Sequence, residues 1–192
     1  MSFFTGTQSE LLYVLPASVT KNTFTTEAAI SSVAGTTALC SLPPGYFNDV
    51  PNAVGRSLYL HAEGIIANTA AATFALNLGL DTTAGTKANS VTVNAAYTPT
   101  ASVTAPFHLD AWYTCTAFAT STFSMQVNGR IVYESVAAGG APTTSSQASG
   151  FQASITGMDP RVQFYIELFG TWSASSASNT TTLHQMLLTG MN

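Results

Sequence analysis

The sequence predicts an all-β protein, an antiparallel β-sandwich or jelly roll of about eight strands with an extended N-terminal arm. In several segments apolar and polar residues alternate with a period of two, as in half-buried strands. No stretch keeps helical spacing for more than about two turns. Loops rich in Gly, Ser, Thr and Pro separate the alternating segments. We therefore expect more than about a third of the residues in strands and under about 10% in helices, against usual values near 20–25% and 30–35%.

The chain begins with a segment, residues 1–30, that we interpret as an arm or a first strand, and residues 31–192 are expected to form one sandwich domain. The arm contains a short apolar run that Pro16 ends, too short for a core helix. One hypothesis makes this run a docking strand on the sheet edge of a neighbouring chain, and the other makes it the first strand of its own subunit. The run consists of Leu11, Leu12, Tyr13, Val14 and Leu15.

Five later segments carry the two-residue alternation most clearly. They are residues 56–66, 73–80, 107–115, 123–127 and 162–172. The prolines and glycine of residues 41–55 predict an irregular connection before the first of them. Small polar residues predict loops at 81–89, 137–149 and 173–182. This order of short strands and loops is typical of a sandwich.

The dipeptide Asn128-Gly129 predicts a β-hairpin turn between two strand runs. A two-residue turn would pair Met125 with Val132. A three-residue loop starting at Val127 would pair Met125 with Ile131 and gather the large apolar groups on one face. We therefore expect the three-residue loop, with Gly129 at a positive φ.

Charge is scarce, because only 7% of the residues are charged, against about 25% in an average soluble domain. The net charge is −4, and the five Lys and Arg residues are too few and scattered for a groove that binds nucleic acid. A surface of small hydroxyls and methyls costs little to desolvate, which suits packing against other subunits. A compositional bias of the genome would produce the same excess of Ala and Thr.

Cys40 and Cys115 lie outside any CxxC or metal-type spacing, and we interpret them as two buried thiols. No apolar run approaches the 18 or so residues that cross a bilayer, so no membrane span is expected. The first residues have neither a basic segment nor a long apolar one, so no secretory signal is expected.

Two strand segments carry an imidazole and a carboxylate on one face, His61 with Glu63 and His108 with Asp110. If the two strands were neighbours, these four side chains could converge on a metal ion. The favoured interpretation is ordinary polar residues on the solvent face of two strands, since a period of two produces this spacing by default. We therefore expect no metal site and no cofactor.

Four further residues could serve catalysis or sugar binding. Glu134 and Glu167 could form the acid pair of a glycosidase, but their spacing in the sequence does not indicate one. The favoured interpretation is that both are carboxylates exposed to solvent or placed at an interface. Trp112 and Trp172 could stack on sugars, although core or interface aromatics are the commoner case. The sequence lacks a G-x-S-x-G motif, a P-loop and a G-x-G-x-x-G motif, so it predicts no enzyme and no catalytic residue.

Short motifs near both ends of the chain resemble a known group of proteins, the jelly-roll virion proteins of tailed bacteriophages. The motifs follow the same order along most of the chain, although each is short and low in complexity. They are residues 22–27 (NTFTTE), 42–47 (LPPGYF), 55–58 (GRSL), 172–179 (WSASSASN) and 182–185 (TLHQ).

The resemblance implies a trimeric β-sandwich on the outside of a virus particle. We expect a capsid decoration, or cement, protein that binds the major capsid protein and reinforces the shell. The alternative is a tail-fibre or tail-tip module that binds a receptor or a glycan. The resemblance offers no catalytic residues. It implies a homotrimer on the outer surface of the virion, assembled in the host cytoplasm. The scarce basic charge and the lack of a long apolar run predict neither nucleic acid nor membrane as a partner.

Overall fold

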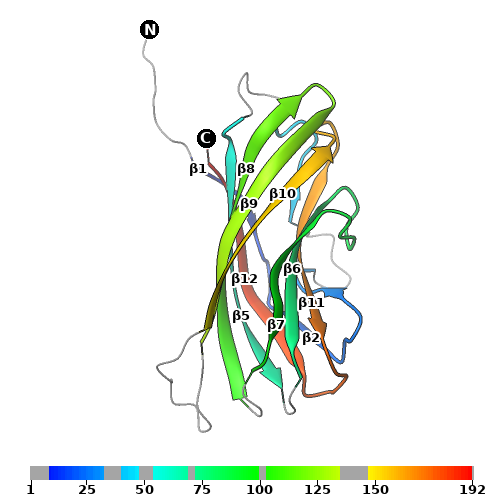
Figure 1. Ribbon diagram of the computed structural model, residues 1–192, viewed down its shortest axis with the longest axis vertical. Helices are drawn as coiled ribbons and strands as arrows, with labels where there is room; N and C mark the ends of the chain where they lie inside the picture. Colours follow the sequence, from blue (N-terminus) through cyan, green and yellow to red (C-terminus); the bar gives the residue numbers. More distant parts are fainter. Residues whose placement is uncertain are drawn as a thin grey trace.

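Twelve strands form two antiparallel sheets in the computed structural model, which describes residues 9–32, 40–47, 54–68, 72–99, 103–134 and 147–191. Strands contain 68% of these residues, and none of them is in a helix. The two sheets pack as the layers of a β-sandwich (Figure 1). This confirms the all-β prediction and the sandwich class.

The larger sheet, sheet A, has seven strands. Its order is β1 (Ser9–Val14), β12 (Thr180–Met191), β5 (Ser57–Asn68), β8 (Val103–Ala119), β9 (Thr122–Tyr133) and β10 (Gln147–Met158). The short strand β2 (Val19–Asn22) pairs with β12 on the same side as β1. Sheet A is therefore six strands wide, with β1 and β2 along one edge and β10 along the other.

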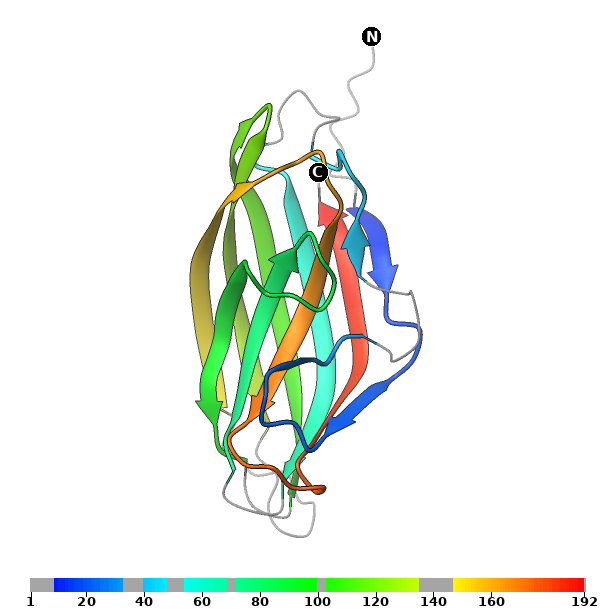
Figure 2. The same ribbon diagram turned by 90° about the vertical axis from the view of Figure 1, so that its right-hand side faces the viewer.

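The smaller sheet, sheet B, has five strands and lies in front of sheet A in Figure 2. Its order is β3 (Ala28–Ala29), β11 (Phe164–Trp172), β6 (Phe74–Asp81) and β7 (Ser90–Tyr97), and β4 (Ser41–Leu42) also pairs with β11. The expected number of about eight strands is too low. Strands β2, β3 and β4 have only four, two and two residues, too few to show any alternation in the sequence.

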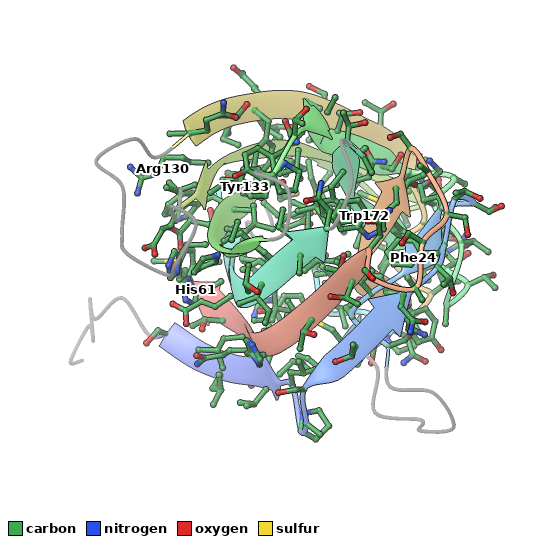
Figure 3. The ribbon with its side chains drawn as sticks, turned by 90° about the horizontal axis from the view of Figure 1, so that it is seen from below. Phe24, His61, Arg130, Tyr133 and Trp172 are labelled. Atoms are coloured by element: carbon green, nitrogen blue, oxygen red, sulfur yellow. The ribbon has the colours of Figure 1, made fainter. Side chains whose placement is uncertain are left out.

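The core lies between the sheets and is built by the alternation. In β5, Leu58, Leu60 and Ala62 are fully buried, while the residues between them face outwards. Figure 3 shows Tyr133 and Trp172 inside the sandwich and Arg130 outside it. Each fully buried large apolar side chain contributes about 1.5–3 kcal/mol to the free energy of folding.

Both cysteines are buried free thiols in this core, as the sequence predicts. Burial raises the pKa of the Cys40 thiol, and the charge of Glu167 adds to the shift. The thiol therefore stays protonated at neutral pH and packs as a small apolar group.

The apolar run at the start of the chain lies in its own subunit's sheet, which is the second of the two hypotheses for this segment. Leu11 pairs with Thr189 and Val14 with Leu187 of β12, and the Leu15 N–H donates to the Met186 carbonyl at 2.8 Å. Leu15 is buried, and Leu12 and Tyr13 pack against the core. Leu11 and Val14 remain 62% and 49% exposed. Residues 1–8 lie outside the described residues.

The hairpin expected at Asn128-Gly129 is wrong, because β9 runs straight through this dipeptide and pairs there with both β8 and β10. The turn between β8 and β9 lies instead at Thr120-Ser121, where Ala119 pairs with Thr122. Gly129 serves packing: a Cβ there would overlap the Phe151 ring and the Asp110 carbonyl oxygen. Close approach of neighbouring groups, rather than a positive φ, explains this glycine.

The expected loops at 81–89 and 173–182 are found, with slightly different bounds. Residues 82–89 connect β6 to β7, and residues 173–179 connect β11 to β12. Of the expected loop at 137–149, residues 137–146 lie outside the described residues and 147–149 begin β10.

The packing around Gly129 predicts an asymmetric effect of two Gly→Ala substitutions. Gly129→Ala should lower the free energy of unfolding by about 1–3 kcal/mol, because the new methyl group meets backbone as well as the Phe151 ring. Gly150 is the matched control, because its nearest neighbouring atom would lie 3.9 Å from the added Cβ. Gly150→Ala should change stability by less than about 0.5 kcal/mol. Chemical denaturation measures both, and equal effects would contradict this account of Gly129.

Candidate functional site

The polar residues singled out from the sequence meet on the outer face of sheet A. Strands β5 and β8 are antiparallel neighbours, and their register places His61 opposite Asp110 and Glu63 opposite His108. The hypothesis that these four side chains come together is therefore confirmed. All four lie on the face turned away from sheet B, because the residues between them in each strand are buried in the core.

A continuous chain of hydrogen bonds links these side chains. His61 contacts Asp110 through Nδ1 at 2.9 Å and Glu63 through Nε2 at 3.0 Å. His108 contacts the same Oε1 of Glu63 through Nδ1 at 3.1 Å, and its Nε2 lies 3.3 Å from Oε1 of Glu134. The Tyr59 hydroxyl donates to Asp110. We call Tyr59, His61, Glu63, His108, Asp110 and Glu134 the outer cluster.

The contacts of His61, Glu63 and Asp110 favour the charged form of each of these three groups. Partial burial lowers the pKa of His61, but its hydrogen bonds to Asp110 and Glu63 outweigh this and leave that pKa above its ordinary value. Burial raises the pKa of Glu63 and Asp110, yet the hydrogen bonds that each accepts hold both pKa values below the ordinary range. Burial and the Asp110 carboxylate raise the pKa of Tyr59 to about 12.

The outer cluster has the geometry of an ion-pair network and not that of a metal centre. Each imidazole has a carboxylate oxygen within 3.3 Å of both of its nitrogens, so the ring nitrogens face carboxylates. In the part of the chain that the structure describes, no group of three or more His, Cys, Asp or Glu side chains is arranged to hold a metal ion.

Apolar side chains lie beside the outer cluster on the same face. The pairing of β1, β12, β5 and β8 puts Leu11, Thr189, Tyr59 and Trp112 in one row across the sheet. Trp112 is 42% exposed, and its ring centroid lies 5.1 Å from that of Tyr59. Among the described residues, the exposed large apolar side chains of this face are Leu11, Val14, Trp112 and Met191.

The remaining candidates from the sequence do not join this site. Glu167 is buried in sheet B, where one of its oxygens accepts a hydrogen bond from the Gly85 N–H at 2.6 Å. It therefore lies in the other sheet from Glu134, and the two do not form an acid pair. Trp172 is fully buried against Phe74, as a core aromatic. His184 lies in the irregular part of β12 next to Gln185, which pairs with Glu63, and its Nδ1 contacts the Ser18 hydroxyl at 3.3 Å.

Sequence reasoning missed Tyr59 and Arg130 as members of this surface. Arg130 lies opposite Asp110 across the β8–β9 pair, and its charge contributes to lowering the pKa of Asp110. The period of two places both residues on the outer side of their strands. Which residue each of them contacts depends on the order of the strands in the sheet, and the local sequence pattern does not reveal that order.

No protein-family model matches the chain, and no curated protein sequence matches it. Among the described residues, no helix is long and apolar enough to cross a membrane.

The outer cluster predicts a stability that depends on pH. Because folding raises the pKa of His61, its stabilising contribution is present below the ordinary value of 6.5 and is lost as the pH rises through the folded value. His61→Gln should therefore cost more at about pH 5.5 than at about pH 8.5, by up to about 1 kcal/mol for a surface pair. His184→Gln is the control. Equal costs of His61→Gln at both pH values in urea denaturation would contradict the prediction.

Proposed function

We propose that this chain is a non-enzymatic structural protein of a bacteriophage virion, a trimeric capsid decoration protein with a jelly-roll fold. It binds the major capsid protein on the outside of the particle and reinforces the shell. The observation that carries the proposal is the outer face of sheet A. This broad face presents Leu11, Val14, Trp112 and Met191 beside an internally paired set of charges.

The energetics of that face favour contact with another protein surface. The carboxylates of the outer cluster already have imidazole partners, so covering them leaves fewer charges without a partner. The neighbouring large apolar side chains gain free energy when water is removed from them, about 25 cal/mol for each Å² buried. We propose that this face packs against a second copy within the trimer.

In this proposal the N-terminal run still contributes to docking, but through exposed side chains and not through its backbone. The backbone of β1 is paired with β12 of its own chain, so Leu11 and Val14 contribute through their exposed side chains. The partly buried Leu12 and Tyr13, and the buried Leu15, hold the strand on its own subunit.

The alternative is a tail-fibre or tail-tip module that binds a receptor or a glycan. The exposed ring of Trp112 favours it, because an aromatic face next to a carboxylate such as Asp110 is a common surface for stacking a sugar. Both roles would place the protein on the outside of the virion, assembled in the host cytoplasm, and neither requires a cofactor.

Two measurements test the proposal. Sedimentation equilibrium of the purified chain should give a number of copies that is a multiple of three, at 20.0 kDa for each copy. Leu11→Asp combined with Val14→Asp should weaken this association, whereas Ser175→Asp, in an exposed loop, should not.

Electron cryomicroscopy of a particle that carries the chain then distinguishes the two roles. Hundreds of copies on the shell would support decoration, and a handful at the tail would support the alternative. A monomer at micromolar concentration with no trimer on the particle would contradict the homotrimer.

A further inference from the structure

Strand β10 forms one edge of sheet A, and its outer side pairs with no strand among the described residues. Residues Gln147–Ile155 of β10 pair with Tyr133–Met125 of β9 in an unbroken antiparallel register. The register shifts only after Ile155, near Gly157, which has a φ of 74°. Along these nine residues, the backbone N–H and C=O groups of alternate residues therefore form a regular row on the free edge.

This edge lacks the features that keep a free strand from pairing with another chain. Strand β10 contains no Lys, Arg, Asp, Glu or Pro. The opposite edge of sheet A is protected by Glu10 on β1, Lys21 on β2 and Pro16 between them. In sheet B, β3 and β4 have two residues each, and the pairing of β7 with β6 shifts register twice. Charges, prolines, short strands and irregularities are the usual means by which sheet edges avoid association.

We propose that the free edge of β10 pairs antiparallel with β10 of a second copy of this chain, which joins two sheets A into one continuous sheet. A twofold axis perpendicular to the sheet makes the two strands antiparallel and keeps outward side chains on the same outer face. Two identical nine-residue rows match in length, and no charge on either strand opposes the contact. Strand β1 matches less well, since it has six residues, Glu10 and a register shift after Leu11.

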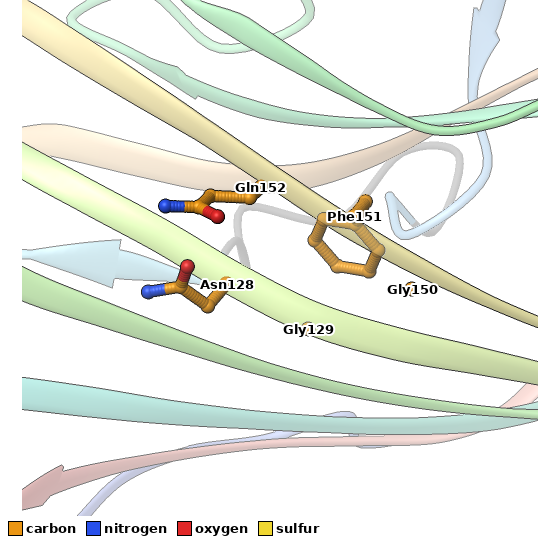
Figure 4. Close-up of a pocket in the computed structure, with 5 residues that line it drawn as sticks. All are labelled: Asn128, Gly129, Gly150, Phe151 and Gln152. Carbon is orange, nitrogen blue, oxygen red and sulfur yellow. The ribbon is translucent and has the colours of Figure 1, made fainter.

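The middle of β10 carries a hollow that suits this contact. Its volume is about 370 Å³, and it is lined by Asn128, Gly129, Gly150, Phe151 and Gln152 (Figure 4). The space above Gly150 is open, because a Cβ there would have no neighbouring atom nearer than 3.9 Å. A twofold axis at Phe151 would place Gln152 of the partner subunit opposite Gly150. Its amide side chain would enter this open space.

The β10 contact is separate from the proposed trimer and does not rest on it. A threefold axis that intersects this twofold axis at a right angle gives an assembly of six copies. Without the trimer, the β10 contact alone gives two copies. The number of copies therefore reports on the two proposals independently: three copies would overturn the β10 contact and leave the trimer, and two copies would do the reverse.

A charge-swap experiment tests the identity of the partner strand. One variant combines Ala148→Lys with Gln152→Lys, and the other combines Ala148→Glu with Gln152→Glu, all at exposed positions of β10. Because the axis at Phe151 places residue 152 of each copy diagonally beside residues 148 and 152 of the other, equal charges lie close together, and each variant alone should associate at least about tenfold more weakly and should sediment with half the wild-type number of copies. An equimolar mixture should restore the wild-type number, since the Lys at position 152 then lies diagonally beside the Glu side chains at positions 148 and 152 of the other variant.

The control is Ser121→Lys combined with Ser175→Lys, which adds the same charge in exposed loops and should leave the wild-type number unchanged. The proposal is overturned if the Lys variant keeps the wild-type number of copies. It is also overturned if the mixture stays at half that number, because β10 would then pair with a different segment.

Discussion

Burial of the facing sides of sheets A and B is the constraint on which the rest of this structure depends. In a strand, when the side chain of one residue points into the core, the side chain of the next residue points to the opposite face. When Leu60 and Ala62 enter the core, His61 and Glu63 must face outwards. The same holds for Leu109 and Ala111 in β8, which fix the outward positions of His108 and Asp110. The outer cluster is therefore a consequence of how the core is packed.

The magnitudes indicate that the outer cluster is not what holds the fold together. An exposed ion pair contributes about 0–1 kcal/mol, whereas each buried Leu or Phe contributes about 1.5–3 kcal/mol. The core contains dozens of buried apolar residues, so removal of one imidazole pair leaves most of the stability intact. What the outer cluster determines is the character of one surface. It pairs imidazoles with carboxylates on a broad sheet face, which lowers the cost of covering that face with another subunit.

The sequence was sufficient for the properties that depend on local pattern. Alternation predicted β5, β6, β8, β11 and part of β9, and the shared face of each His and carboxylate pair, but it did not predict β7, β10 or β12. The local pattern was insufficient where strand order or close packing determines which residues contact one another. Asn128-Gly129 resembles a turn by composition, but the approach of Phe151 and of the Asp110 backbone makes Gly129 a packing residue within β9. The contact of His61 with Asp110 likewise requires β5 and β8 to be neighbours, a fact of topology alone.

We propose that the outer face of sheet A is covered when the protein assembles, and the exposed Trp112 ring reports on that face. The other tryptophan, Trp172, is fully buried, so a dissolved quencher such as iodide does not reach it. Fluorescence quenching by iodide should be measured at a concentration where the protein is assembled and again after dilution to single subunits. Trp112 should be shielded from iodide in the assembly and should become accessible to it on dissociation. Equal quenching of Trp112 in both states would contradict the proposal.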